Sequence, residues 1–338
     1  MSDFADFLDA KFDLDERSLA REVRDECFAA IAGRRRLRCC DVGTGTGAMV
    51  RRVLDAARGA AAIEIDAIDR DDGLLARALE QLRAHLARHG CTTTQVESVG
   101  SGSGSGAWSE DRGTEPATAD IECCPAPTTR RIEALQEDRL AAPQARRRIT
   151  VRLLRTDAAR FEPAAGERYD LVTAHAFMDL VPMRPLLDRF AAWLAPGGLF
   201  YATLNYDGQT TLLPSYADAG FEAELLRRYD ASMEARRVAG EPTGGAHSGR
   251  RLYAMLPEAG FEIVACASSD WNALPHRGRL RPGDRFVVAV LLDAIRRENQ
   301  AHGEADRVAA WWHDRRTRLE MGTLGAIVHQ IDILALRR

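Results

Sequence analysis

A glycine-rich turn constrains this chain more than any other feature: the segment Asp41-Val42-Gly43-Thr44-Gly45-Thr46-Gly47. An apolar run from Leu37 to Val42 leads into the turn, and apolar residues at helical spacing follow it from Met49 to Ala57. A strand, a glycine turn and a helix in this order open the nucleotide-binding α/β folds. Glycine lets the backbone approach a ligand closely, and the following helix N-terminus presents unpaired N–H groups.

The glycine spacing alone leaves two kinds of ligand open. Gly43, Gly45 and Ala48 also fit the G-x-G-x-x-G/A fingerprint of NAD-binding folds. Asp41 places a carboxylate two residues before the first glycine. A negative charge at that point suits a cationic ligand and is a poor neighbour for a pyrophosphate. The motifs that follow must therefore decide between the two ligands.

Four further motifs follow in a fixed order: Asp69-Arg70 after an apolar strand, Asp157-Ala158, the strand Tyr169–His175, and the turn Leu194-Ala195-Pro196-Gly197-Gly198. Together with the glycine turn, this set resembles the class I S-adenosylmethionine-dependent methyltransferases over about residues 37–204. The resemblance implies an α/β fold, with a Rossmann-like sheet of seven strands flanked by helices. It also implies S-adenosylmethionine as the cofactor, with an NAD-type Rossmann fold as the alternative.

The resemblance assigns cofactor-binding roles within these motifs. Asp41 would order the loop and favour the cationic methionyl end. Asp69 would accept both ribose hydroxyls, because a carboxylate has two acceptor oxygens and no donor. Asp157 and Ala158 would face the adenine. The predicted cofactor-binding set is Asp41, Gly43, Thr44, Gly45, Gly47, Asp69, Arg70, Asp157, Ala158 and His175.

The chain is expected to divide into a helical lid, residues 1–35, and a methyltransferase domain, residues 36–338. Residues 92–147 are rich in glycine, serine and proline and contain few large apolar side chains, which predicts a disordered insertion. A second insertion, 206–249, is rich in aromatic residues and follows the fifth strand, at the edge where open α/β sheets bind ligands. Helices at 282–298 and 305–320 and a last strand at 324–336 complete the expected order.

The acceptor site is predicted at the carboxyl ends of the strands. A base is needed only if the acceptor is still protonated, and the catalytic candidates are His175, His247 and Asp270, with Asp179 as a further carboxylate after the fourth strand. The segment His247-Ser248-Gly249-Arg250 joins a titratable group, a helix start and an arginine, so an anionic acceptor is expected there. Surface residues without a ligand are the alternative for this segment. The predicted substrate residues are Asn205, His247, Arg250 and Trp271.

Composition limits the partners. The net charge of −4 gives no electrostatic reason to expect nucleic acid. No apolar run is long enough to span a bilayer, and the acidic N-terminus does not have the layout of a signal peptide, so a cytoplasmic location is expected. The seven cysteines lack the spacing of a zinc site, so no metal is expected. Lys11 is the only lysine among 46 lysines and arginines. The oligomeric state stays open.

Three functions remain compatible with the sequence. The first is methylation of a small molecule, because Ala174-His175-Ala176-Phe177-Met178-Asp179 replaces the Asn-Pro-Pro-aromatic signature of many nucleic-acid and protein N-methyltransferases. The second is methylation of RNA or protein, for which the run Arg146-Arg147-Arg148 could form a basic docking edge. The third is a protein that binds S-adenosylmethionine without transferring its methyl group.

Overall fold

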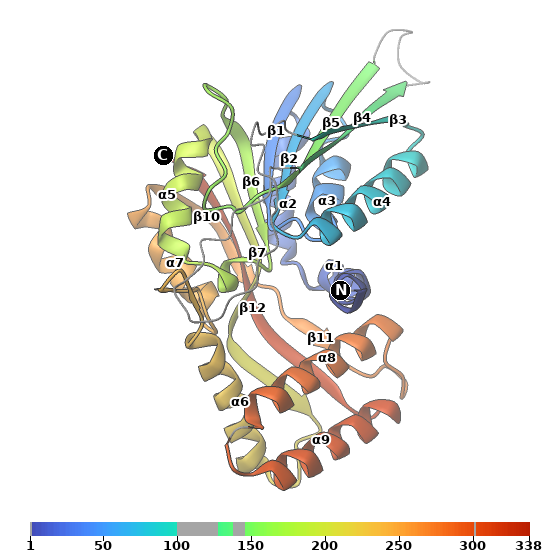
Figure 1. Ribbon diagram of the computed structural model, residues 1–338, viewed down its shortest axis with the longest axis vertical. Helices are drawn as coiled ribbons and strands as arrows, with labels where there is room; N and C mark the ends of the chain where they lie inside the picture. Colours follow the sequence, from blue (N-terminus) through green and yellow to red (C-terminus); the bar gives the residue numbers. More distant parts are fainter. Residues whose placement is uncertain (1, 100–127, 138–145, 301) are drawn as a thin grey trace, which may run out of the picture.

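The computed structural model describes residues 2–99, 128–137, 146–300 and 302–338 (Figure 1). Two helices come first, α1 (Ser2–Ser18) and α2 (Arg21–Ala32). The principal strands are β1 (Arg36–Val42), β2 (Ala62–Asp69), β3 (Thr92–Val99), β4 (Thr128–Glu137), β5 (Arg146–Arg155), β6 (Tyr169–His175), β7 (Leu194–Leu213), β10 (Phe261–Ser268), β11 (Trp271–Ala273) and β12 (Gly325–Arg337). The remaining helices are α3 (Ala48–Ala56), α4 (Asp72–Arg88), α5 (Met183–Trp193), α6 (Ala219–Glu234), α7 (Ser248–Glu258), α8 (Pro282–Asn299) and α9 (Ala305–Glu320). A short turn of 3₁₀-helix (Met178–Leu180) and a small hairpin, β8 (Arg237–Val238) with β9 (Glu241–Pro242), complete the description.

The strands form one sheet in the order β10-β12-β7-β6-β1-β2-β5-β4-β3, and β11 pairs with β12. Strands β5, β2, β1, β6 and β7 are parallel, while β12 runs antiparallel between β7 and β10. The seven strands expected from the sequence are all present, and the α/β fold with a helix-flanked sheet is confirmed. Because the parallel strands share one carboxyl edge, the motifs that end β1, β2, β5 and β6 come together there.

Part of the 92–147 segment is ordered, and the expectation of disorder across it is wrong for its two flanks. Residues Thr92–Val99 and Thr128–Glu137 pair as an antiparallel hairpin, and β4 also pairs with β5 along its length. Ile132 and Ala134 of β4 are buried in the same cluster as Ile149 and Val151 of β5. The central residues 100–127, which include Cys123 and Cys124, and residues 138–145 lie outside the described part of the chain.

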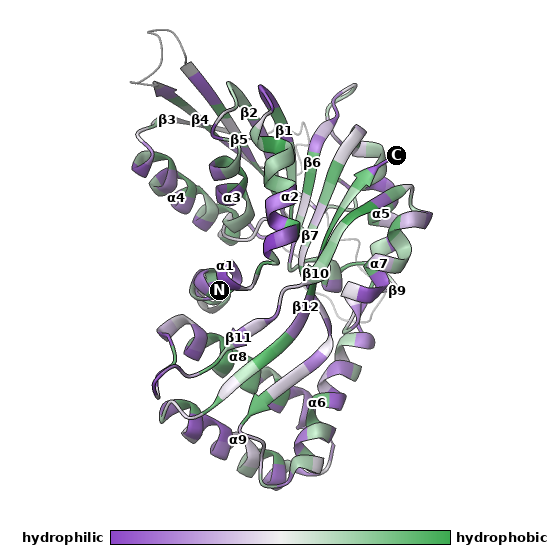
Figure 2. Cartoon of the chain, turned by 180° about the vertical axis from the view of Figure 1, so that it is seen from behind, coloured by the Kyte–Doolittle hydropathy of each residue, from purple (hydrophilic) through white to green (hydrophobic). Residues whose placement is uncertain are grey.

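Helices cover both faces of the sheet because successive strand residues point to opposite sides. Cys39 packs with α2, α3 and α4 on one face, whereas its neighbour Cys40 packs with α5 and α7 on the other. Burial raises the pKa of both thiols well above the ordinary value, as expected for inert core cysteines. Figure 2 shows the result, with hydrophobic colour concentrated on the central strands and hydrophilic colour on the outer turns of the helices.

A lower lobe grows out of the sheet itself (Figure 1). Strand β7 has 20 residues and β12 has 13, and they remain paired from Leu199 with Leu336 to Leu213 with Gly325. Helices α6, α8 and α9 pack on this extension around the fully buried Trp311. The helices expected at 282–298 and 305–320 are therefore confirmed. The 206–249 segment, in contrast, begins as a continued strand before it becomes α6.

A buried carboxylate fixes the point where the two lobes join. Asp332 lies at a register shift between β12 and β7, where Leu204 has a φ of 54°. The backbone N–H of Leu204 donates to Asp332 Oδ1 over 2.7 Å, and the N–H of Ala20 donates to Oδ2 over 2.9 Å. Burial raises the pKa of Asp332 to about 6. One side chain thus holds both a bend in β7 and the start of α2.

Within the described ranges, no helix has the length and apolar character that crossing a membrane requires.

The β3–β4 hairpin predicts a measurable stability effect. Ile132 is 1% exposed, so Ile132→Ala should lower the free energy of unfolding by about 2–4 kcal/mol through lost burial and a cavity. Leu135 lies on the same strand and is 45% exposed, so Leu135→Ala is the matched control and should change little. Urea unfolding of the two variants tests the packing. Equal, small effects would show that the hairpin does not contribute to the core.

Candidate functional site

The glycine loop between β1 and α3 is anchored from beneath by Asp41. Its buried carboxylate accepts hydrogen bonds from the hydroxyls of Thr44 and Thr173, the latter over 2.6 Å. The loop N–H groups of Gly43 and Thr44 donate to Ile68 O at the end of β2. Burial raises the pKa of Asp41 to about 6, and the two hydroxyls oppose that rise. Asp41 therefore orders the loop, as expected, but it lies beneath the loop and not in the wall of the cavity described below.

Gly43 shows why the loop needs glycine. Its φ is +65°, and a Cβ placed there would lie 2.3 Å from Cδ2 of Phe177. Any larger residue would strain the backbone and displace the Phe177 ring. The close approach joins the glycine loop to the segment that follows β6, and both segments line the same cavity.

The acidic strand ends lie beside this loop. Asp69 ends β2, and its Oδ2 accepts from the Gly45 N–H over 2.9 Å while Oδ1 accepts from Asp71 N–H over 3.0 Å. Burial raises the pKa of Asp69, and these backbone donors partly offset the rise. Asp157 follows β5 and is exposed, with its Oδ1 turned to the Ala159 N–H at 2.8 Å. Both carboxylates line the cavity.

The cavity has a volume of about 760 Å³ and extends from the glycine loop into the lower lobe. Its first half is lined by the sequence motifs: Gly43, Thr44, Gly45, Asp69, Arg70, Asp157, Ala158 and His175. Its second half is lined by residues of β7, α6, β11, α8 and β12: Tyr206, Thr210, Tyr229, Met233, Trp271, Leu291, Val328 and Gln330. A cavity of this size and mixed lining is typical of small-molecule sites.

One face of α1 closes the cavity between its two halves. Phe4, Phe7, Leu8, Lys11 and Asp15 line it at helical spacing. Residues 1–35 were expected to cover the cofactor, and the structure does place α1 along the cavity. The only lysine of the chain is therefore a cavity residue, and its side chain is almost completely buried.

Asp15 joins this helix to the rest of the site. Its Oδ2 lies 2.7 Å from Lys11 Nζ and 3.1 Å from His175 Nε2, and Trp271 Nε1 donates to Oδ1 over 3.0 Å. Burial alone would raise the pKa of Asp15, but Lys11, His175 and Arg52 outweigh burial and lower it. An ionised carboxylate is thus held at the meeting point of α1, β6 and β11.

His175 has protein partners on both ring nitrogens. Nε2 faces Asp15 and also lies 3.3 Å from Arg52 Nη1, while Nδ1 lies 2.7 Å from Thr203 Oγ1. The ionised Asp15 needs a donor, which assigns the proton to Nε2 and leaves Nδ1 to accept from Thr203. Burial, followed by Arg52, lowers the pKa of His175 to about 4, so the ring is neutral at pH 7. Such a ring positions the cavity wall and has no nitrogen free for a substrate proton.

The predicted substrate residues separate into two groups. Trp271 lines the cavity, whereas the other predicted substrate residues, Asn205, His247 and Arg250, do not. His247 Nδ1 lies 2.9 Å from Glu234 Oε1, and Arg250 binds Asp207 with its guanidinium. These acids already pair with the side chains that were expected to bind an anionic acceptor, and His247 holds the N-cap position of α7. Asn205 is buried with its Nδ2 donating to Ile331 O, and Asp270 pairs with His329 at 2.8 Å.

Several cavity residues were not among the predicted site: Lys11, Asp15, Tyr206, Tyr229 and Gln330. The single lysine in an arginine-rich chain was the one available signal for Lys11. Gln330 is 4% exposed, and its Oε1 has no hydrogen-bond partner among the described residues. Buried polar atoms are nearly always paired, so this oxygen is available to a ligand.

The lowered pKa of His175 predicts a pH effect on stability. An unfolded histidine titrates near pH 6.5, whereas His175 titrates at about 4 in the folded protein. Its contribution to the free energy of unfolding is therefore present above pH 6.5 and is lost as the pH falls towards 4. In His175→Gln the decline over this range should be smaller than in the wild type, measured by urea unfolding. The exposed His313→Gln should keep the wild-type decline. The assignment is wrong if both variants decline equally.

The chain is similar to known methyltransferases. A family model described as "Methyltransferase domain" matches residues 12–265. Among solved structures, YjhP from Escherichia coli is 14% identical and aligns over 97% of this chain and 99% of its own, with a TM-score of 0.44. A methyltransferase from Thiobacillus denitrificans, solved with S-adenosyl-L-homocysteine, is 14% identical over 97% of this chain and 98% of its own, with a TM-score of 0.42. No curated protein matches the chain. Because the family model spans more than half of its length, the chain belongs to the methyltransferase-domain family.

Proposed function

We propose that this protein transfers a methyl group from S-adenosylmethionine to a small acceptor that has an apolar or flat body and a hydrogen-bond donor. The observation that carries the proposal is the single cavity that runs from the glycine loop into the lower lobe. It offers one end to a cofactor and the other to an acceptor. Methyl transfer is a displacement at carbon, for which a protein mainly supplies alignment and the exclusion of water.

The cofactor end suits a cationic nucleoside. Asp69, Asp71 and Asp157 line it and favour a positive ligand. Ala48, the first residue of α3, lines the same space, and the lack of a Cβ at Gly43 lets the loop lie close to Phe177. These residues fit S-adenosylmethionine, which would supply the electrophilic methyl group. In this assignment Asp69 accepts the ribose hydroxyls, and Ala158 packs beside the adenine.

The acceptor end is mostly apolar. Tyr229, Met233, Leu291 and Val328 line it, so a flat or aliphatic body buries favourably there. The unpaired Oε1 of Gln330 would accept a hydrogen bond from a hydroxyl or amine of the acceptor. Lys11 is already paired with Asp15, and the lining also includes Asp179 and Glu241. The anionic acceptor expected from His247 and Arg250 therefore gains no support from the cavity lining.

Asp179 is the candidate base if the acceptor must lose a proton. It follows β6 in the short 3₁₀-helix and lines the cavity. Burial raises its pKa, which brings the carboxylate closer to the basicity that proton transfer at neutral pH requires. His175, with both nitrogens engaged, is assigned a positioning role.

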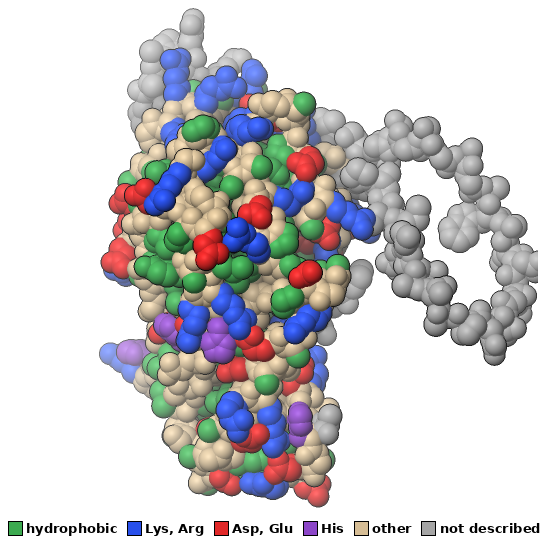
Figure 3. All heavy atoms as spheres, turned by 90° about the vertical axis from the view of Figure 1, so that its left-hand side faces the viewer, with side chains coloured by type: hydrophobic (Ala, Val, Ile, Leu, Met, Phe, Trp, Pro, Cys, Tyr) green, Lys and Arg blue, Asp and Glu red, His purple; other side chains and the backbone are tan. Residues whose placement is uncertain are grey.

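The alternative of RNA or protein methylation finds less support. The guanidinium of Arg147 donates inward to the carbonyls of Leu54 and Ala57 and to Gln136 Oε1. It therefore does not belong to an outward basic edge. On the face seen in Figure 3, basic and acidic side chains are intermixed rather than gathered by sign.

Labelling experiments would separate these functions. Incubation with methyl-labelled S-adenosylmethionine and a cell extract should place the label in the small-molecule fraction. Label mainly in RNA or protein would refute the proposed acceptor class. Cofactor binding with no label transferred would indicate a binding protein without methyl transfer.

Cofactor identity predicts the effect of one substitution. The protein should bind S-adenosylhomocysteine and not NAD in calorimetry. Asp69→Asn should weaken that binding by about 1–3 kcal/mol, because ribose hydroxyls and loop N–H groups lose a carboxylate acceptor. Asp188→Asn, an exposed acid on α5, is the control and should bind as the wild type does. Binding of NAD in place of S-adenosylhomocysteine would overturn the assignment.

The role of Asp179 predicts a kinetic signature. Once the acceptor is identified, Asp179→Asn should lower kcat by roughly 10²-fold while S-adenosylhomocysteine affinity stays within about threefold of wild type. The wild-type rate should rise with pH through a pKa above the usual aspartate range, and the variant should lack that limb. Glu241→Gln removes another carboxylate from the cavity lining and should leave kcat near wild type. A normal rate in Asp179→Asn would exclude this base.

A further inference from the structure

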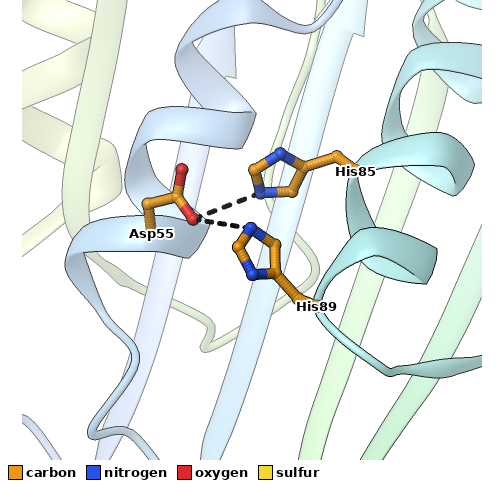
Figure 4. Close-up of side chains that lie close together, drawn as sticks. All are labelled: Asp55, His85 and His89. Atoms are coloured by element: carbon orange, nitrogen blue, oxygen red, sulfur yellow. Dashed lines mark ion pairs between the residues drawn. The ribbon is translucent and has the colours of Figure 1, made fainter.

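Three potential metal ligands that the cavity does not use meet between α3 and α4 (Figure 4). Asp55 projects from α3 and His85 from α4, and His89 is the residue that caps the C-terminus of α4. Asp55 Oδ1 lies 3.4 Å from His85 Nε2 and 3.3 Å from His89 Nε2. The four-residue spacing of the histidines places them on one side of the helix, facing the same carboxylate.

The distances fit a shared metal ion better than a hydrogen bond. Protein N–H···O bonds usually span about 2.7–3.2 Å, shorter than either contact. Zinc binds nitrogen and oxygen ligands at about 2.0–2.2 Å, and two ligands at a tetrahedral angle are then about 3.3–3.5 Å apart. Both distances fall in this range, and the three ligand atoms all lie within 4.8 Å of one another.

The side chains next to Asp55 and His85 decide whether an ion can bind these residues. His85 is 7% exposed, so its ring is held at the contact between the two helices, beside Asp55. Arg58 Nη2 donates to the same Asp55 Oδ1 over 2.8 Å, and it competes with an ion for that oxygen. The Arg58 side chain is 62% exposed, so it can turn to the other carboxylate oxygen or to water.

We propose that Asp55, His85 and His89 bind a divalent transition-metal ion of the zinc type, with water as a fourth ligand. The ion would clamp α3 to α4 from the outside of the sheet. Because α3 begins at Ala48, directly after the glycine loop, the clamp would stiffen the helix that supports that loop. No metal was expected from the sequence because the cysteines lack zinc-site spacing, and the two histidines approach Asp55 only in the folded chain.

Zinc binding to the tag-free protein tests the proposal without any measurement of methyl transfer. Cys123, Cys124 and Cys266 are changed to serine throughout, because thiols can bind zinc themselves. Calorimetry with zinc should give one ion per chain, and zinc should raise the melting temperature, since an ion that binds only the folded state stabilises it. With cobalt in place of zinc, the visible absorption bands of four-coordinate cobalt should appear.

The variants decide the location of the ion. His85→Gln and His89→Gln should each weaken zinc binding at least tenfold and abolish the zinc-induced rise in melting temperature. His313→Gln removes an exposed histidine from α9 and should leave both quantities unchanged. The rise is compared with each variant's own zinc-free melting temperature, so a moderate loss of stability does not obscure the result. No zinc bound by the parent protein, or undiminished binding in His85→Gln and His89→Gln, would overturn the proposal and leave Asp55 as a plain polar contact between two helices.

Discussion

The contacts of the ionised Asp15 carboxylate hold together the walls of the cavity. It is 1% exposed and is held by Lys11, Trp271 and His175, which come from three separate elements. A buried charge is tolerated only while its partners remain in place, so the loss of any one would weaken the others. The position of α1 over the cavity, the neutral ring of His175 and the orientation of Trp271 therefore form one coupled arrangement.

Asp332 is a second buried carboxylate that joins separate elements, here at the sheet. It accepts hydrogen bonds from Leu204 in β7 and from Ala20 at the start of α2. The first bond stabilises a residue whose positive φ would otherwise be unfavourable within a strand. The second fixes where the N-terminal helices leave the sheet. Asp332, and Asp15 through His175 and Trp271, thus join segments that are far apart in the sequence.

Much of the fold was predictable because its signals are local. Short stretches of sequence are enough to predict the glycine turn, the apolar strands and the helices at 282–299 and 305–320. The β3–β4 hairpin was missed because its strands are largely polar and flank a segment rich in glycine and serine. The acceptor side was harder to place. His247 and Arg250 do suit an anion, but Glu234 and Asp207 neutralise them through contacts that the sequence alone does not reveal.

The long pairing of β7 with β12 also determines how ligands can reach the cavity. Their hydrogen bonds continue from the main sheet into the lower lobe. A hinge motion that separated the two lobes would have to break this ladder and the Asp332 contacts together. Elements outside this ladder also line the cavity, among them α1 and the β8–β9 hairpin, and these can move without breaking it. Movement of α1 away from the cavity would require Asp15 to separate from His175 and Trp271, so these two contacts set the free-energy cost of opening that path.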